Sequence, residues 1–308
     1  MDQHVVAPGE RIEPVQSAAR AVKRCYELEA KTAPTRKKMR HLRGMFEGLT
    51  AAFQMFAESG AKEIKTKKTQ RYYLDTRKLK LRELGIELRV KELDAKEFKL
   101  TAKLPFDLDL GLDENDPNNK AQGNQERIAS IARKEEISAS FSKGERIHLD
   151  WLIPNLPESL AEKLREKVLG ETILPYLSNR IKRQEVEVDL AQNNPDETRT
   201  ETDKTIPVEI AYDEYVVATR YKKFRKCAQM EIELVTGKKG DIPSRSPLFT
   251  YMGLLQGIQA FDCASWTSTA KSDPGFALLQ QRLKQGKEIK PLRNRHIPRW
   301  LRQACPKP

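Results

Sequence analysis

The stretch at residues 98–104 reads FKLTAKL, and its side chains alternate in character along the chain. Every second position is apolar, namely Phe98, Leu100, Ala102 and Leu104. The positions between them are Lys99, Thr101 and Lys103. Because side chains of a β-strand point alternately to its two faces, this pattern predicts a strand with one apolar and one basic face. The reason for the charge on the basic face has to be sought in the other segments of the chain.

Further segments of strand length surround this stretch. Strands are predicted at residues 64–75, 85–92, 96–104, 132–141, 180–190, 208–217 and 228–235. Helical spacing of apolar residues occurs instead at 37–59, 156–168, 249–261 and 275–285, and residues 22–31 fit a strand or a helix. A polar loop is expected at 106–125. Short connections favour antiparallel neighbours, so the predicted fold class is α+β.

Residues 27–31 read ELEAK and place two acids and a lysine at alternate positions. On a strand, Glu27, Glu29 and Lys31 would share one face, whereas a helix would scatter them around its axis. A chain of this composition should contain about one such pattern by chance. The motif therefore gains weight only from the other charged strands.

Three later segments each carry charge of a single sign on one strand face. Arg89 and Lys91 share a face in LRVK, and Lys99 and Lys103 share one in FKLTAK. The acids Glu231 and Glu233 share a face in MEIEL. A solvated outer face is the ordinary explanation of charged strands, but such a face tends to mix the two signs.

Close like charges repel one another unless a counter-ion lies between them. Two adjacent acidic pairs would be stabilised by a divalent cation, and converging bases would be stabilised by a polyanion. A closed antiparallel barrel with inward-facing charges and a wet interior would supply both sites. The charge pattern therefore favours a barrel that binds an anionic ligand together with a metal.

The net charge of +12 is unevenly distributed over the 308 residues. Residues 281–308 hold nine bases and one acid, so this segment carries +8 and the remaining chain +4. We therefore expect a flexible lead-in at 1–18, one folded domain at 19–280 and a basic tail at 281–308. Such a tail could contact an anionic partner.

Composition also bears on the compartment. No apolar run approaches the roughly 18 residues of a membrane helix, and the first ten residues lack the apolar core of a signal peptide. The four cysteines, at positions 25, 227, 263 and 305, form no CxxC pair, which favours thiols in a reducing compartment. A cytoplasmic protein without a membrane span is expected.

Nine segments, taken in order, resemble the CYTH-type triphosphate tunnel metalloenzymes. They are ELEAK (27–31), the helix ending at Gly60, QRYYLDT (70–76), LGIELRVK (84–91), LTAK (100–103), RKE (133–135), VEIAYD (208–213), MEIELVTG (230–237) and AKSDPGF (270–276). The resemblance extends from about residue 22 to residue 279. Each segment is weak alone, and the order of all nine is specific.

The resemblance implies an antiparallel eight-stranded β-barrel, the triphosphate tunnel, with helices packed outside it. It implies Mg²⁺ or Mn²⁺ on four carboxylates, those of Glu27, Glu29, Glu231 and Glu233. It implies phosphate binding by seven bases, Lys31, Arg89, Lys91, Lys103, Arg133, Arg183 and Lys271. Glu27, Glu29 and Lys31 would form the catalytic group. Glu209 and Asp213 also match acids of the family, and could serve metal binding or ion pairs in the tunnel wall.

The function implied by the resemblance is metal-dependent hydrolysis of a triphosphate, with inorganic tripolyphosphate the most generic substrate and orthophosphate the product. Class IV adenylate cyclase, thiamine triphosphatase and RNA triphosphatase are alternatives on the same fold. An alternative of another class is a non-catalytic module that binds polyphosphate or nucleic acid through residues 281–308. The chain departs from the family's SKxxRG motif at Ala270 and Pro274, and has Gln229 where glutamate is common, which bears on substrate preference.

Overall fold

The computed structural model describes residues 20–32, 35–56, 63–105, 132–191, 205–235, 266–267 and 270–305. The lead-in expected at 1–18, the loop expected at 106–125 and the helix expected at 249–261 lie outside these residues. Within the described chain, no helix combines the length and the apolar character needed to cross a membrane.

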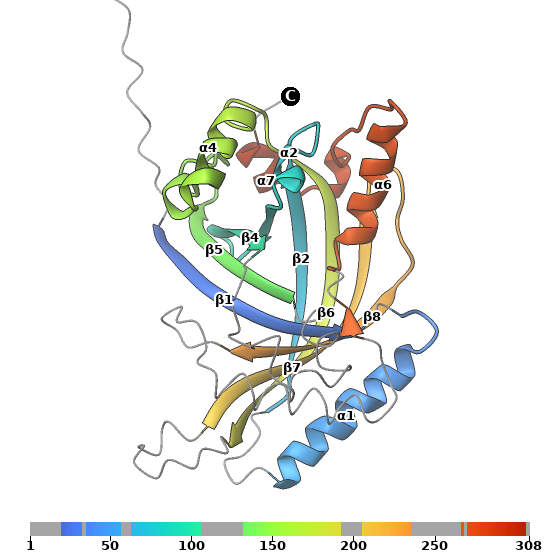
Figure 1. The fold of residues 1–308 in the computed structure, drawn as a ribbon. Coiled ribbons are helices and arrows are strands. Elements are labelled where there is room, and N and C mark those ends of the chain that lie inside the picture. The colour runs from blue at the N-terminus through green and yellow to red at the C-terminus, as the bar shows by residue number, and fades with distance from the viewer. Residues whose placement is uncertain are drawn as a thin grey trace, which may run out of the picture.

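Nine antiparallel strands form one sheet (Figure 1). They are β1 (Arg20–Thr32), β2 (Lys65–Asp75), β3 (Glu87–Glu92), β4 (Glu97–Pro105), β5 (Ala132–Ser142), β6 (Leu174–Ala191), β7 (Thr205–Thr219), β8 (Cys227–Val235) and β9 (Trp266–Thr267). Their order is β5-β4-β3-β2-β6-β7-β8-β1-β9. The residues that alternate in the sequence therefore form strands, including the segment 22–31, which is a strand and not a helix.

Pairing between β1 and β5 turns this sheet into an eight-stranded barrel. The first half of β1 pairs with β5 and the second half with β8, so that Glu27, Leu28 and Glu29 have partners on both sides. The short strand β9 adds to β1 beyond this ring. The predicted α+β fold with an antiparallel eight-stranded barrel is confirmed, and the ring gives its strands an inner face.

Helices pack against the barrel. They are α1 (Met39–Phe56), α2 (Lys80–Glu83), α4 (Glu158–Lys167), α6 (Asp273–Lys284) and α7 (Arg299–Ala304), with two short 3-10 turns at Ile153–Asn155 and Asn294–His296. Helix α1 lies against β7 and β8 (Figure 1). Its Leu42 and Phe46 are buried with Met230 and Ile232, and the Phe46 ring centroid is 6.2 Å from that of Tyr212. On β7 and β8 the apolar face is thus an outer face, which leaves their charged face inside.

The C-terminal segment differs from the expected separate tail. Residues through Cys305 pack into the larger of the two cores, where Trp300, Leu301 and Ala304 are buried. The Trp300 ring stacks on Phe98 with 5.2 Å between centroids. Regularly spaced apolar residues between the bases anchor this segment to the outer face of the barrel, so the boundary expected at residue 281 does not separate a tail from the domain.

Helix α6 closes part of the barrel interior with apolar groups. A Cβ atom placed on Gly275 would lie 1.9 Å from Cδ1 of Leu177, so only glycine allows the helix to approach this closely. The ring of Phe276 meets Tyr73 edge-on at 6.2 Å. The interior is therefore apolar beside α6, and the polar cavity lies next to that plug.

Candidate functional site

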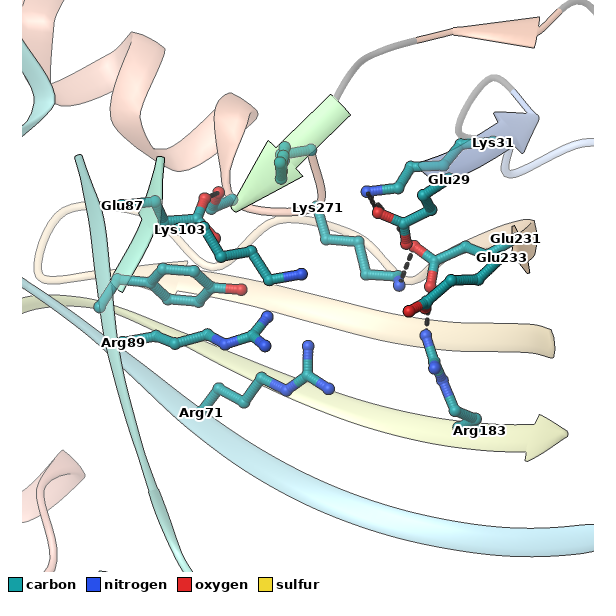
Figure 2. A pocket seen from close by; sticks show the side chains of 14 residues that line it. Glu29, Lys31, Arg71, Glu87, Arg89, Lys103, Arg183, Glu231, Glu233 and Lys271 are labelled. Carbon is teal, nitrogen blue, oxygen red and sulfur yellow. Dashed lines mark hydrogen bonds and ion pairs between the residues drawn. The ribbon is translucent and has the colours of Figure 1, made fainter. Parts of the chain in front are cut away.

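A charged cavity lies inside the barrel (Figure 2). About 80 Å³ of it is open to the centres of water-sized molecules. Strands β1, β2, β3, β4, β5, β6 and β8 and the start of α6 all contribute side chains to its lining. These are Glu29, Lys31, Arg71, Tyr73, Glu87, Arg89, Lys103, Lys134, Arg183, Glu231, Glu233, Ala270, Lys271 and Ser272. Seven of these residues are bases and four are acids, so the lining has a positive excess.

Carboxylates gather on one side of the cavity, which we call the acidic wall: Glu29, Glu209, Asp213, Glu231 and Glu233 on β1, β7 and β8. The strand register brings them together, because Glu233 lies directly across from Glu29 on one neighbour and from Glu209 on the other. Directly opposed positions place Cβ atoms about 5 Å apart. Three acids on three adjacent strands therefore form one row.

Glu231 lies at the centre of an ion-pair network on this wall. Its carboxylate contacts Lys271 and Arg183, and Lys31 Nζ lies 3.7 Å from it (Figure 2). Burial alone would raise the pKa of Glu231, but Lys271, Arg183 and Lys31 outweigh burial and hold this pKa far below its ordinary value. Glu231 is therefore a carboxylate at neutral pH.

Asp213 extends the network from β7. Its fully buried Oδ2 lies 2.8 Å from a guanidinium nitrogen of Arg183 and 2.6 Å from Lys271 Nζ. Arg183 also pairs with Glu209 at 2.9 Å. The network ties the start of α6 to β6, β7 and β8, since Lys271 lies two residues before that helix. Removing one member would leave a buried charge uncompensated.

Bases dominate the opposite side, which we call the basic wall: Arg71, Arg89 and Lys103 on β2, β3 and β4. Figure 2 shows Arg71, Arg89 and Lys103 extending from this side toward the acidic wall. Arg89 lies 2.7 Å and Lys103 3.6 Å from the same carboxylate, that of Glu136. In the described chain, the buried Nε of Arg71 has no hydrogen-bond partner. Burial and the nearby Arg89 lower the pKa of Arg71.

One acid, Glu87, is set into the basic wall. Its Oε2 accepts a hydrogen bond of 2.6 Å from the Ser272 hydroxyl. Burial opposes its charge, but Lys134, that hydrogen bond, Arg89 and Lys103 lower the pKa of Glu87 to about 2. Glu87 thus stays ionised and offsets part of the positive charge around it.

Most of the sequence-predicted residues meet in this cavity. They are Glu29, Lys31, Arg89, Lys103, Arg183, Glu231, Glu233 and Lys271. Lys91 does not line the cavity but lies next to it, across from Arg71 on β2 and Lys99 on β4. Burial, Arg71, Lys99 and Arg89 lower the pKa of Lys91 to about 8. The side chains of Glu27 and Arg133 lie outside the described part of the structure.

Two of the predicted phosphate-side bases have a different setting from the one expected. Arg183 and Lys271 both pair with Asp213 and Glu231, so they belong to the acidic wall. For β5, the described lining of the cavity includes Lys134.

Sequence reasoning missed Arg71, Glu87, Lys134 and Ser272. Residues two apart on a strand share a face, and this rule could have found two of them. Arg71 lies two residues before the inward-facing Tyr73 in QRYYLDT, and Glu87 lies two residues before Arg89 in LGIELRVK. No signal marked Ser272, because its role depends on where α6 begins relative to β3. Its hydroxyl reaches Glu87 across 185 positions of sequence.

The acidic wall has the donor chemistry of a magnesium or manganese site, since these ions prefer oxygen ligands. The buried Oε2 of Glu29 lies 2.7 Å from Lys31 Nζ, which makes an ion pair. The angles between the two groups are not those of a hydrogen bond, so this oxygen has no hydrogen-bond partner in the described chain. No group of three or more metal-binding side chains converges among the described residues. Mg²⁺ commonly uses one or two carboxylates and completes its shell with water and phosphate, so the residues fit such an ion.

No protein-family model and no curated protein sequence matches this chain. Solved structures with a similar fold include a candidate adenylate cyclase from Bacillus halodurans, 14% identical, with a TM-score of 0.41, covering 82% of this chain and 97% of that one. A candidate adenylyl cyclase from Hippeastrum, described as having a dominant triphosphatase activity, is 13% identical with a TM-score of 0.35. The match covers 86% of this chain and 97% of that one.

The RNA triphosphatase of S. pombe, in complex with the Spt5 CTD, is 10% identical with a TM-score of 0.30 and covers 82% of this chain and 88% of that one. Similarities of this size concern the fold alone. The function proposed below therefore rests on the residues of the cavity.

Proposed function

We propose that this protein is a metal-dependent hydrolase of a triphosphate, with inorganic tripolyphosphate as the substrate and orthophosphate as a product. The observation that carries the proposal is the cavity itself, where seven bases and four acids from separate strands converge inside a barrel. The lining has more bases than acids, and an anionic ligand would compensate this excess of buried positive charge. A linear polyanion with a bound divalent cation provides compensation of both signs.

The basic wall would hold the phosphate chain. Arg71 and Arg89 present guanidinium groups, which can donate two parallel hydrogen bonds to one phosphate, whereas Lys103 acts as a point charge. The buried Arg71 Nε, which has no partner within the described chain, is a donor available for such a bond. These side chains would orient the triphosphate along the barrel.

The acidic wall would hold the metal through Glu29, Glu231 and Glu233, with Glu27 as a further ligand predicted from the sequence. When bound, Mg²⁺ or Mn²⁺ neutralises phosphate oxygens and stabilises charge that shifts to the leaving group. Lys31 lies near Glu29 and Glu231, and Lys271 contacts Glu231 and Asp213, which supports a role for both lysines in binding phosphate oxygens near the metal. Water would attack the terminal phosphorus, the bridging P–O bond would break, and orthophosphate and pyrophosphate would leave.

The hydrolase is tested with tripolyphosphate, ATP and thiamine triphosphate, each with Mg²⁺, with Mn²⁺ and with chelator. We expect orthophosphate from tripolyphosphate in the presence of metal and none with chelator. Pyrophosphate together with a cyclic nucleotide from ATP would instead indicate a class IV cyclase. No turnover of any substrate, combined with tight tripolyphosphate binding, would favour the non-catalytic binding module and contradict the proposal.

A further inference from the structure

A second charged depression lies on the outside of the barrel. Residues 218–223, which follow the long β7 strand, form one part of it, and residues 293–298 of the C-terminal segment form another. Its floor is the outer face of β2, β6 and β7, where Tyr72, Ser178 and Ala218 are directly opposed in the strand register. About 650 Å³ of this groove is open to the centres of water-sized molecules, compared with about 80 Å³ in the barrel cavity.

Bases surround this groove without any acid among the described lining residues. They are Arg180, Arg220, Lys222, Lys223, Arg293, Arg295 and His296. In the described chain, no carboxylate lies within 4.0 Å of the charged nitrogens of these arginines and lysines. Three separate segments thus direct like charge toward one space, and an anionic partner would relieve their repulsion.

Apolar side chains lie between the bases. Tyr72, Tyr221, Ile297 and Pro298 line the same groove. Tyr221 is held in place, because its hydroxyl accepts a 2.7 Å hydrogen bond from the backbone of Lys290 and its ring carries the Arg282 guanidinium at 3.8 Å. Inorganic polyphosphate offers only charge. A nucleic acid strand offers phosphates together with nucleobases, whose flat faces can pack against aromatic and apolar side chains.

We propose that this outer groove binds single-stranded RNA through its phosphodiester backbone. The proposal is independent of the hydrolase, since the groove and the cavity lie on opposite faces of the same strands. On β2, Gln70 and Tyr72 line the groove while Arg71 and Tyr73 line the cavity. Arg293 and Arg295, which a charge count of the sequence assigns to a tail, form one wall of this groove.

The test measures binding of a 3′-fluorescein-labelled twelve-nucleotide oligouridylate by fluorescence anisotropy in 50 to 300 mM KCl. The strand carries a 5′-hydroxyl, so that it presents no triphosphate to the barrel. We expect affinity to fall with salt, with a log–log slope of about −3 if roughly four phosphates are engaged. The triple variant Lys223→Glu, Arg293→Glu, Arg295→Glu should bind about 30-fold more weakly at 100 mM KCl and lose about two units of slope.

The matched control reverses three exposed lysines outside the groove, Lys96→Glu, Lys163→Glu and Lys167→Glu. It changes net charge equally and should alter affinity less than about threefold. Both variants should retain tripolyphosphate hydrolysis, because none of the six residues lines the cavity. The proposal is overturned if the groove variant binds like the unaltered protein or if both variants weaken binding equally. Tighter, groove-dependent binding of a labelled twelve-residue polyglutamate peptide would also overturn it, since the groove would then take an acidic protein.

Discussion

The two walls of the barrel cavity contain similar residue types but balance their charges differently. On the acidic wall, Lys271 contacts Glu231 and Asp213, and Arg183 contacts both of these acids and Glu209. Near the basic wall, by contrast, Arg89, Lys99 and Lys103 all contact one carboxylate, that of Glu136, and Glu87 is a second acid among these bases. Each of these two acidic-wall cations thus contacts several acids, whereas several cations near the basic wall contact the same acid.

This difference assigns separate tasks to the walls. A compensated network fixes the positions of its carboxylates, which is what a metal with strict geometry requires. A cluster of bases attracts an added polyanion. The cavity therefore separates the positioning of the metal from the binding of phosphate, and variants on the two walls should fail in different ways.

The largest effect is expected from Glu29→Gln on the acidic wall. The change removes a metal-binding charge and keeps the side-chain shape, so kcat for tripolyphosphate should fall about 1000-fold, as several kcal/mol of metal stabilisation implies. Steady-state kinetics over a range of Mg²⁺ concentrations measure it. Glu185→Gln is the control, because Glu185 is also buried and paired with a lysine, Lys67, but does not line the cavity. Wild-type kinetics of Glu29→Gln at low metal would show that Glu29 binds no metal.

A smaller effect of another kind is expected on the basic wall. Arg89→Met removes hydrogen bonds to a charged phosphate, so kcat/KM should fall about 10- to 100-fold. The metal concentration that gives half-maximal activity should stay the same, because Arg89 is not on the acidic wall. Arg89→Lys keeps the charge and should recover part of the loss. If Arg89→Met raised the metal requirement as much as Glu29→Gln does, the division between the walls would be wrong.

A pH effect follows from Lys91. Its pKa of about 8 belongs to the free protein, in which burial and the cations around it disfavour the charged form. Because the protonated form attracts phosphate, kcat/KM should decline by about three- to tenfold between pH 7.5 and pH 9. Lys91→Arg stays charged and should flatten this limb of the pH profile. An unchanged profile in Lys91→Arg would exclude Lys91 from substrate binding.

The smallest effect on activity is expected from Asp75, a buried acid outside both walls. Its carboxylate accepts hydrogen bonds from the backbone of Thr76, Leu81 and Arg82. Asp75→Ala should therefore lower the free energy of unfolding by about 3 kcal/mol and leave KM unchanged. A changed KM in folded Asp75→Ala protein would show that Asp75 contributes to substrate binding.

The pH dependence of stability gives a second readout on Asp75. Burial raises its pKa to about 7, above the ordinary value of 3.8. The stability that Asp75 contributes is then present at low pH and lost as pH rises through 7. The stability advantage of the unaltered protein over Asp75→Asn, from urea unfolding, should be larger at pH 5 than at pH 8. An advantage that grows with pH would contradict this assignment.

The sequence could predict which face of each strand is charged, because alternation is a local property. Alternation therefore predicted most of the barrel strands and placed Glu29, Lys31, Arg89, Lys103, Glu231 and Glu233, which line the cavity, on charged faces. Two further lining residues, Arg183 and Lys271, were predicted only from the resemblance to the tunnel family. The pairing of strands is not local. Arg183 was expected to bind phosphate because its sequence neighbourhood does not show that β7 and β8 place Asp213, Glu209 and Glu231 around it.

The packing of the C-terminal segment was likewise not predictable from local sequence. Nine bases in residues 281–308 indicate an independent tail when only charge is counted. Ile289, Leu292 and Leu301 are nevertheless buried, and they hold the segment on the barrel surface. The apolar surface that receives them comes from distant strands, so a local charge count could not reveal it.

The most direct test of the division between the walls is a crystal structure with Mn²⁺ and tripolyphosphate, in which anomalous scattering locates the metal. We expect Mn²⁺ in contact with Glu29 or Glu233, and phosphate oxygens in contact with Arg71 and Arg89. Tripolyphosphate bound outside the barrel, or Mn²⁺ held without any carboxylate of the acidic wall, would contradict it.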